Sequence, residues 1–168
     1  MDVKRAGPNS TMGLPPDRPS FVLDRMLGRL AKWLRVMGLD VLYDNTYDAH
    51  DLLRISGQTG RLIVTRNTWF ESHRDVRSIV LHDNYTVGQM KDLLKRLNIA
   101  PDPARFFTRC TVCNAELASV TGEQVKGTVP EYVLHTTTAF SRCPVCGRIY
   151  WGGTHKQNML QTLKAVTG

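Results

Sequence analysis

Four cysteines stand at the spacing of a metal site. Cys110 and Cys113 form one Cys-x2-Cys pair, Cys143 and Cys146 form a second, and the chain contains no other cysteine. Two such pairs predict tetrahedral binding of one zinc ion, and a closed shell of four thiolates predicts a structural rather than a catalytic ion. Two disulfides are the alternative, which the lack of an apolar secretion signal at the N-terminus disfavours.

A second group of polar residues follows short apolar runs that read as buried strands. Asp24, Asp44 and the pair Arg66 and Asn67 each come directly after such a run, and Asp48 lies four residues after Asp44. The carboxyl ends of parallel strands meet at one edge of a sheet, where ligands and chemistry gather. Carboxylates gathered there suit Mg²⁺ or Mn²⁺, and such an ion can activate water for attack on a phosphodiester. The alternative is that each residue caps a helix or forms a turn.

The charge of the chain favours a polyanionic partner. The net charge is +7 and the pI is about 9.5, which indicates nucleic acid without specifying it. Arg25, Arg29 and Lys32 form a stripe at helical spacing that begins beside Asp24, and Arg35 extends it. We expect this stripe and Arg66 to contact nucleic-acid phosphates, although a solvated helix face has the same spacing.

Cations and aromatic side chains also mix after the second cysteine pair. Arg142, Arg148, Tyr150, Trp151 and His155 lie within this segment. Such mixtures stack bases and hold phosphates, and we expect Arg148 to bind nucleic acid. In the alternative interpretation Tyr150 and Trp151 pack the cysteine module against the rest of the chain.

The elements that must position these residues alternate between strands and helices. Apolar runs predict strands at 21–23, 41–43, 62–65 and 77–81, and amphipathic patterns predict helices at 25–37, 48–56, 86–98 and from 154 onward, with a short helix or turn near Trp69. Gly57 is expected to end the second helix, and Thr86 with Gln89 to form a capping box. The alternation predicts an α/β fold with a parallel sheet.

The composition divides the chain into three parts. Residues 1–19 are rich in Pro, Gly and Ser and predict a disordered leader, 20–104 an α/β domain, and 105–168 a zinc ribbon with a C-terminal helix and an inserted hairpin between the cysteine pairs. The sequence has no apolar run long enough to cross a membrane. We expect a cytoplasmic protein, with an organelle left open, and the sequence does not bear on the oligomeric state.

Several blocks of the sequence resemble one family. They are FVLDRMLGRLAKWLRVMGLDVLYDN, RLIVTRN, FTRCTVCNAEL, VPEYV and CPVCGRIYWGGTH, and in this order they resemble the Mut-seven C-terminal RNase family over roughly residues 21–163. The resemblance implies a PIN-like three-layer α/β domain with a C-terminal zinc ribbon, and metal-dependent cleavage of RNA. The acidic positions of the family match Asp24, Asp44 and Asp48. The family motif Thr-Arg-Asp, which closes the third strand, here ends in Asn67, so an amide replaces a carboxylate.

Three functions are compatible with these observations. The chain is expected to be an RNA-binding endoribonuclease that uses Mg²⁺ or Mn²⁺ at a site impaired by Asn67. It could instead be a catalytically inactive RNA-binding protein docked on a ribonucleoprotein such as a ribosome. The third hypothesis is a zinc-ribbon module that binds protein or DNA.

Overall fold

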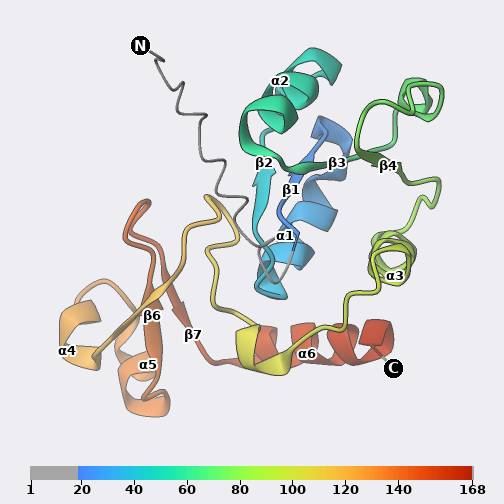
Figure 1. Cartoon of the computed structure of the whole chain (residues 1–168). Helices are drawn as coiled ribbons and strands as arrows, with labels where there is room; N and C mark the ends of the chain where they lie inside the picture. Colours follow the sequence, from blue (N-terminus) through green and yellow to red (C-terminus); the bar gives the residue numbers. More distant parts are fainter. Residues whose placement is uncertain (1–18, 168) are drawn as a thin grey trace, which may run out of the picture.

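A computed structural model describes residues 19–167 of the chain (Figure 1). The expected leader, residues 1–19, lies outside this range apart from Pro19 and stays a prediction. The first half of the described chain forms a parallel sheet with the strand order β2-β1-β3-β4. The strands are β1 (Phe21–Leu23), β2 (Val41–Tyr43), β3 (Leu62–Thr65) and β4 (Ser78–Val80). The predicted α/β fold with a parallel sheet is therefore confirmed.

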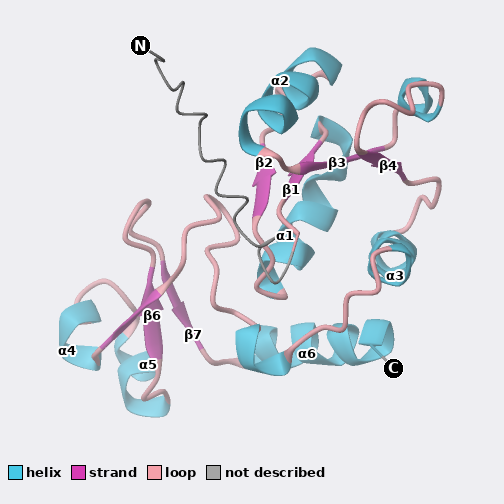
Figure 2. Ribbon diagram, viewed as in Figure 1, coloured by secondary structure: helices cyan, strands magenta, loops and turns pink. Residues whose placement is uncertain are grey.

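Helices cover both faces of this sheet, which gives three layers (Figure 2). The α-helices of this domain are α1 (Gly28–Val36), α2 (Ala49–Thr59) and α3 (Thr86–Arg96), and the 3-10 turns are η1 (Arg25–Leu27), η2 (Thr68–Glu71) and η3 (Pro103–Arg105). Side chains of β1 alternate between the two faces. Phe21 and Leu23 pack in one core with α1 and α3, whereas Val22 packs in the other with α2 and η2.

Two predicted helix boundaries were wrong. The second helix continues through Gly57 and ends at Gly60, whose φ of 70° is the left-handed conformation that glycine adopts most easily. Thr86 is the first residue of α3 rather than its cap. The side-chain amide of Gln89 instead donates to the carbonyl oxygen of Asp83 at 2.9 Å, so the expected capping box does not form.

The cysteine module has its own antiparallel sheet, β5 (Ala118–Val120), β6 (Phe140–Arg142) and β7 (Ile149–Trp151), in that order. Between β5 and β6 the chain forms two short helices, α4 (Gly122–Val125) and α5 (Glu131–Thr136), in place of the expected hairpin. Val125, Val133 and Phe140 give this module a small core. The sheet and the four cysteines it carries have the form of a zinc ribbon.

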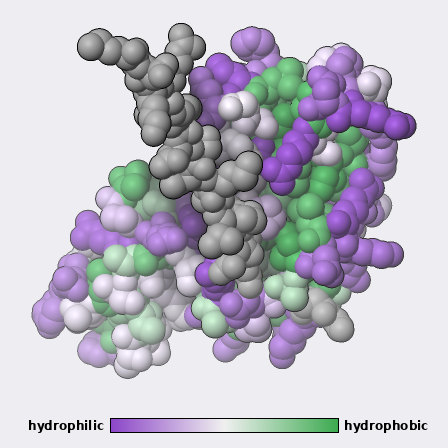
Figure 3. Space-filling view, viewed as in Figure 1, coloured by the Kyte–Doolittle hydropathy of each residue, from purple (hydrophilic) through white to green (hydrophobic). Residues whose placement is uncertain are grey.

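The last helix returns from the ribbon to the first domain. Helix α6 (Thr154–Thr167) lies below α1 and α3 in Figure 1 and buries Met159 and Leu163 in the core that α1 and α3 share. In the space-filling view, a band of hydrophobic residues on the sheet domain is bordered by hydrophilic residues on the side away from the ribbon (Figure 3). The chain therefore crosses twice between the two modules, once before the ribbon and once after it.

Arg35 joins the two modules and is not part of the exposed stripe, contrary to expectation. Its side chain is buried. Its Nε and Nη2 donate to the carbonyl oxygen of Val41 at 3.0 and 2.8 Å, and its Nη1 donates to those of Thr111 and Val112 at 3.1 and 2.9 Å. One guanidinium thus ties the end of α1 and the start of β2 to the first cysteine loop, using the several donors that arginine holds in a fixed plane.

Candidate functional site

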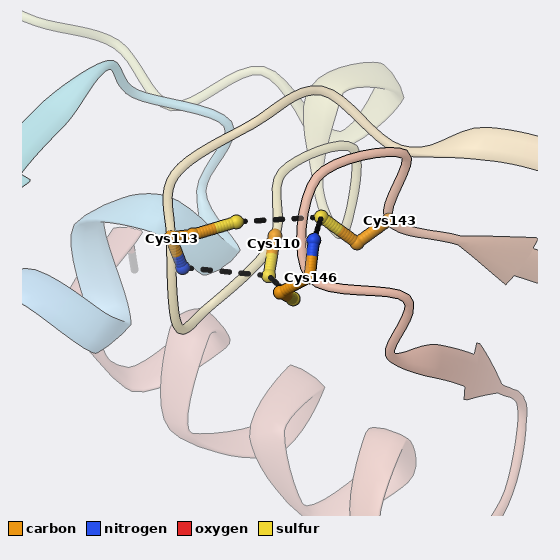
Figure 4. Close-up of side chains that lie close together, drawn as sticks. All are labelled: Cys110, Cys113, Cys143 and Cys146. Carbon is orange, nitrogen blue, oxygen red and sulfur yellow. Dashed lines mark hydrogen bonds between the residues drawn. The ribbon is translucent and has the colours of Figure 1, made fainter.

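The four cysteines converge on one point (Figure 4). Their sulfur atoms all lie within 4.8 Å of one another. The sulfur atoms of Cys110 and Cys146 are 3.6 Å apart, and those of Cys113 and Cys143 are 3.3 Å apart. A zinc ion with Zn–S bonds of about 2.3 Å implies sulfur–sulfur distances of about 3.8 Å, whereas a disulfide requires about 2.0 Å. The donor set and its spacing fit a four-thiolate zinc site, and they do not fit disulfides.

Hydrogen bonds favour the thiolate form of two of the four cysteines, Cys110 and Cys143, whose pKa values are lowered. The backbone N–H groups of Cys113 and Cys146 donate to the sulfur atoms of Cys110 and Cys143 at 3.5 and 3.4 Å. Burial opposes ionisation of Cys110, but hydrogen bonds from the Tyr150 hydroxyl and the loop backbone outweigh it and lower its pKa from 9.0 to about 6. The thiolate is the form that binds metal. Burial and the neighbouring thiols raise the pKa of Cys113 in the same loop to about 12, so binding an ion must release the proton of that thiol.

The two aromatic residues of β7 differ in their roles. The Tyr150 hydroxyl lies 3.1 Å from the sulfur of Cys110 and accepts a hydrogen bond from the backbone N–H of Thr111 at 3.3 Å. Burial and the neighbouring Cys110 raise the pKa of Tyr150 to about 12, so it remains a neutral phenol. Trp151 is 41% exposed, and the alternative that it packs the ribbon against the sheet domain stays a prediction.

A cleft of about 460 Å³ opens at the carboxyl edge of the parallel sheet. Five of the predicted site residues line it: Asp24, Arg25, Asp48, Arg66 and Asn67. Asp44 is exposed and does not line the cleft. The structure therefore brings five of the predicted side chains together and separates Asp44 from them.

Asp24 forms the floor of the cleft and joins two strands. Its carboxyl group is buried. One oxygen accepts from the backbone N–H of Met26 at 2.8 Å, which caps η1. The other accepts from the Thr65 hydroxyl at 2.5 Å and from the backbone N–H of Arg66 at 2.8 Å. The carboxylate is thus fixed in place by three donors from the ends of β1 and β3.

Asp48 and Asp44 each accept a hydrogen bond from a nearby backbone N–H group. Asp48 Oδ1 accepts from the backbone N–H of Asp51 at 3.0 Å and forms a capping box at the start of α2. Asp44 Oδ1 accepts from the hydroxyl and the backbone N–H of Thr46 at 2.7 and 2.9 Å, and these bonds hold the pKa of Asp44 below its usual range. The turn formed by Asp44 therefore keeps its carboxylate away from the cleft.

Asn67 is both a helix cap and a residue of the cleft, which the sequence analysis treated as alternatives. Its side-chain oxygen accepts from the backbone N–H of Trp69 at 3.0 Å, so it caps η2, and the same residue lines the cleft with Asp24 and Asp48. The partner of the Arg66 guanidinium among the described residues is an amide rather than a carboxylate. Its Nη2 donates to the side-chain oxygen of Asn84 at 2.6 Å, and its buried Nε has no hydrogen-bond partner within residues 19–167.

Among the described residues, two carboxylates rather than the three predicted for a Mg²⁺ or Mn²⁺ site line the cleft. Within residues 19–167, the cysteine cluster is the one group of three or more His, Cys, Asp or Glu side chains that could hold a metal. Asp24 and Asp48 are engaged as caps, and their charges are matched by Arg25 and Arg66 on the same lining. The expected convergence of several carboxylates is therefore not seen.

The basic stripe leads from the cleft toward the ribbon. Arg25, Arg29 and Lys32 are exposed, and Arg25 lines the cleft. Because β1 and β2 are parallel, α1 begins at the carboxyl edge of the sheet and ends at the amino edge, where Arg35 contacts the first cysteine loop. Arg148, beyond the second cysteine pair, is also exposed. The cations therefore extend along the molecule rather than forming one patch.

Sequence reasoning missed an aromatic pair beside the cleft. Trp69 and His73 stack with ring centroids 3.5 Å apart and an interplanar angle of 21°. The residues on either side of Trp69, Thr68 and Phe70, both line the cleft. The sequence did contain a signal for this pair, because Trp69 and His73 are four residues apart and Trp69 lies two residues after Asn67.

Comparison with known proteins supports one family. A family model described as the Mut7-C RNAse domain matches residues 19–163, which include the parallel sheet and the cysteine module. Comparison with curated proteins found no match, and comparison with solved structures found none either. Among the described helices, none is long and apolar enough to cross a membrane.

Proposed function

The chain belongs to the Mut7-C RNase domain family of PIN-like ribonucleases, and from that premise we propose that it binds RNA across the cleft and along α1, with an impaired RNA-cleaving site. Asp24 and Asp48 are the acidic residues of this site. Asn67 supplies an amide where the related motif has a carboxylate. The impairment follows because an amide keeps one oxygen ligand but removes the negative charge that would attract a divalent cation.

The charge balance of the cleft is the observation that carries this proposal. Two carboxylates, Asp24 and Asp48, share one lining with two guanidinium groups, Arg25 and Arg66. A cleft with an additional carboxylate would repel a phosphodiester unless a cation neutralised it. With Asn67 in this position the formal charges cancel, so an RNA strand can enter without an ion.

The exposed cations extend the binding surface beyond the cleft. Arg25, Arg29 and Lys32 follow one another along the exposed face of η1 and α1, and Arg148 adds a cation in the ribbon. Contacts to phosphates release counterions, so we expect affinity for RNA to fall steeply as salt increases. Zinc has a structural role in this proposal, because four thiolates leave no open coordination position.

The test combines binding with cleavage. We expect a labelled single-stranded RNA to bind with strong salt dependence and in preference to duplex DNA. Cleavage of the same RNA in Mn²⁺ should be weak, and Asp24→Asn should reduce it further. Binding to duplex DNA alone, or no nucleic-acid binding, would contradict the proposal and favour a ribbon that binds DNA or protein.

A fully active metal-dependent endoribonuclease is the second candidate. It is favoured by the positions of Asp24, Asp48 and Asn67, which line the same cleft at the carboxyl edge of the sheet. Rapid Mn²⁺-dependent cleavage by the unchanged chain, abolished by Asp24→Asn, would establish it. Tight RNA binding with no cleavage at all would instead indicate an inactive RNA-binding protein, for which a ribonucleoprotein such as the ribosome is a suitable partner.

A further inference from the structure

The Trp69 side chain is a large apolar surface that the fold covers only in part. It is 43% exposed, although indole rings are among the most costly side chains to leave in water. Trp69 packs edge-on to Phe70, with ring centroids 5.0 Å apart and an interplanar angle of 87°. Phe70 is itself buried and lines the cleft, so the indole is attached directly to the cleft wall.

Several contacts fix the indole in place. His73 stacks on it, and the Nδ1 atom of His73 hydrogen-bonds to the carbonyl oxygen of Trp69 at 2.9 Å. The Ser72 hydroxyl donates to the same oxygen at 2.9 Å, and Asn67 holds the backbone N–H of Trp69. A surface side chain held on both its backbone and its ring loses little further freedom when a ligand binds.

We infer that Trp69, supported by His73, is a stacking platform for an unpaired base of the RNA strand that occupies the cleft. The inference rests on the proposed RNA binding and adds how a single strand is recognised, through a base that is free to stack. The cations of the cleft lining, Arg25 and Arg66, can hold the phosphates of that strand while the adjacent indole takes a base. A duplex would keep its bases paired and could not use the platform.

A stacked base and a neutralised phosphate differ in their dependence on salt, which makes the platform testable. Stacking releases no counterions, whereas removing one cation that neutralises a phosphate of a single strand lowers the slope of log affinity against log salt by about 0.7. We expect Trp69→Ala to weaken binding of a labelled oligoadenylate by roughly 5- to 100-fold with an unchanged slope. Arg25→Ala should flatten the slope.

Two further comparisons isolate the stacked base. Trp69→Phe should retain most of the affinity, because it keeps an aromatic face. Tyr132→Ala is the matched control and should bind like the unchanged protein. Tyr132 is also an exposed aromatic side chain (69%), but it lies on α5 of the ribbon. An oligoadenylate with abasic positions should bind the unchanged protein more weakly, and its disadvantage should disappear in Trp69→Ala.

The outcomes separate this inference from the proposed function. If the unchanged protein binds oligoadenylate and Trp69→Ala binds it equally well, the platform is excluded and RNA binding stands. A flatter salt slope in Trp69→Ala would also exclude stacking, because it would show that the variant neutralises fewer phosphates. If the unchanged protein binds no oligoadenylate even at low salt, the proposed RNA binding fails and the platform fails with it.

Discussion

Asn114 donates a hydrogen bond from its side-chain amide to the carboxylate of Asp40 at 2.6 Å, across the boundary between the ribbon and the sheet domain. The side-chain oxygen of Asn114 accepts from the backbone N–H of Val41 at 3.0 Å. Asn114 directly follows the first cysteine pair and has a φ of 71°, a conformation that asparagine tolerates better than most residues. The first cysteine loop therefore closes the amino edge of β2, opposite the cleft.

The contacts of Asn114 with Asp40 and Val41 form a joint between the ribbon and the sheet domain. Loss of zinc should disturb this joint as well as the ribbon. We expect one zinc ion per chain by metal analysis and none in Cys110→Ser, because zinc supplies on the order of 10 kcal/mol of folding free energy in small modules of this type. Val145→Ser is the matched control, since Val145 lies in the second cysteine loop, is 74% exposed and is not a ligand. A stable zinc-free protein with two disulfides would disprove the assignment.

The joint should also give the protein a defined acid sensitivity. Burial opposes ionisation of Asp40, but hydrogen bonds from Arg61 and Asn114 outweigh it and hold the pKa of Asp40 below its ordinary value of 3.8. A lowered pKa in the folded state stabilises the protein above about pH 4, and this stabilisation is lost as the pH falls through the folded value. Arg61 contributes two of these bonds, at 2.8 and 3.0 Å.

We therefore expect Asp40→Asn to be less stable than the unchanged chain at pH 7 by about 1–3 kcal/mol. Urea unfolding curves of the two proteins should converge as the pH falls below about 4, because protonation removes the same charge from the unchanged chain. Asp75→Asn, at an exposed position, should change neither curve. A constant difference between the two proteins at every pH would show that the charge of Asp40 is not what stabilises the joint.

The basic stripe gives a prediction that depends on salt. Arg29→Ala combined with Lys32→Ala should weaken binding to single-stranded RNA and reduce the slope of log affinity against log salt by about 0.7 for each phosphate that is no longer neutralised. Lys91→Ala with Lys95→Ala is the matched control, because both lysines are exposed on α3. An unchanged affinity and slope in the first pair would mean that the stripe is only a solvated helix face.

Much of the fold could be predicted because its signals are local. Short apolar runs between turn residues located all four parallel strands. Glycine signals were less specific, since Gly57 and Gly60 are both candidates for the end of α2. Only Gly60 adopts a positive φ, while Gly57 stays within the helix at a cost of about 1 kcal/mol relative to alanine.

The site was harder to predict because several of its side chains form hydrogen bonds with residues far along the chain or with the local backbone. The four cysteines were identified from spacing alone, since both loops carry the motif. Arg35 has the spacing of the basic stripe, but its partner Thr111 lies 76 residues later in the chain. Asp44 precedes Thr46, which binds its carboxylate in a turn. The periodicity of the sequence does not reveal either the contact of Arg35 with the cysteine loop or the turn formed by Asp44.

The role of Asn67 can be decided by separating its charge from its capping bond. Asn67→Asp keeps a cap for η2 and adds a negative charge to a cleft that already contains Asp24 and Asp48. Asn67→Ser is the matched control, because serine caps about equally well and adds no charge. Measurements on the three proteins should cover Mn²⁺ affinity by calorimetry, RNA cleavage in Mn²⁺, and RNA affinity without metal.

We expect Asn67→Asp to bind Mn²⁺ more tightly and to cleave RNA faster, because a third carboxylate supplies both a charged oxygen ligand and a negative potential for the cation. Without metal the same variant should bind RNA more weakly and be equally stable or less stable by up to about 1 kcal/mol, since like charges now share the cleft. Asn67→Ser should match the unchanged chain in Mn²⁺ affinity and in RNA binding. If Asn67→Asp and Asn67→Ser behave alike, position 67 acts only as the cap of η2, and the impaired site must be explained by the bonds that engage Asp24 and Asp48.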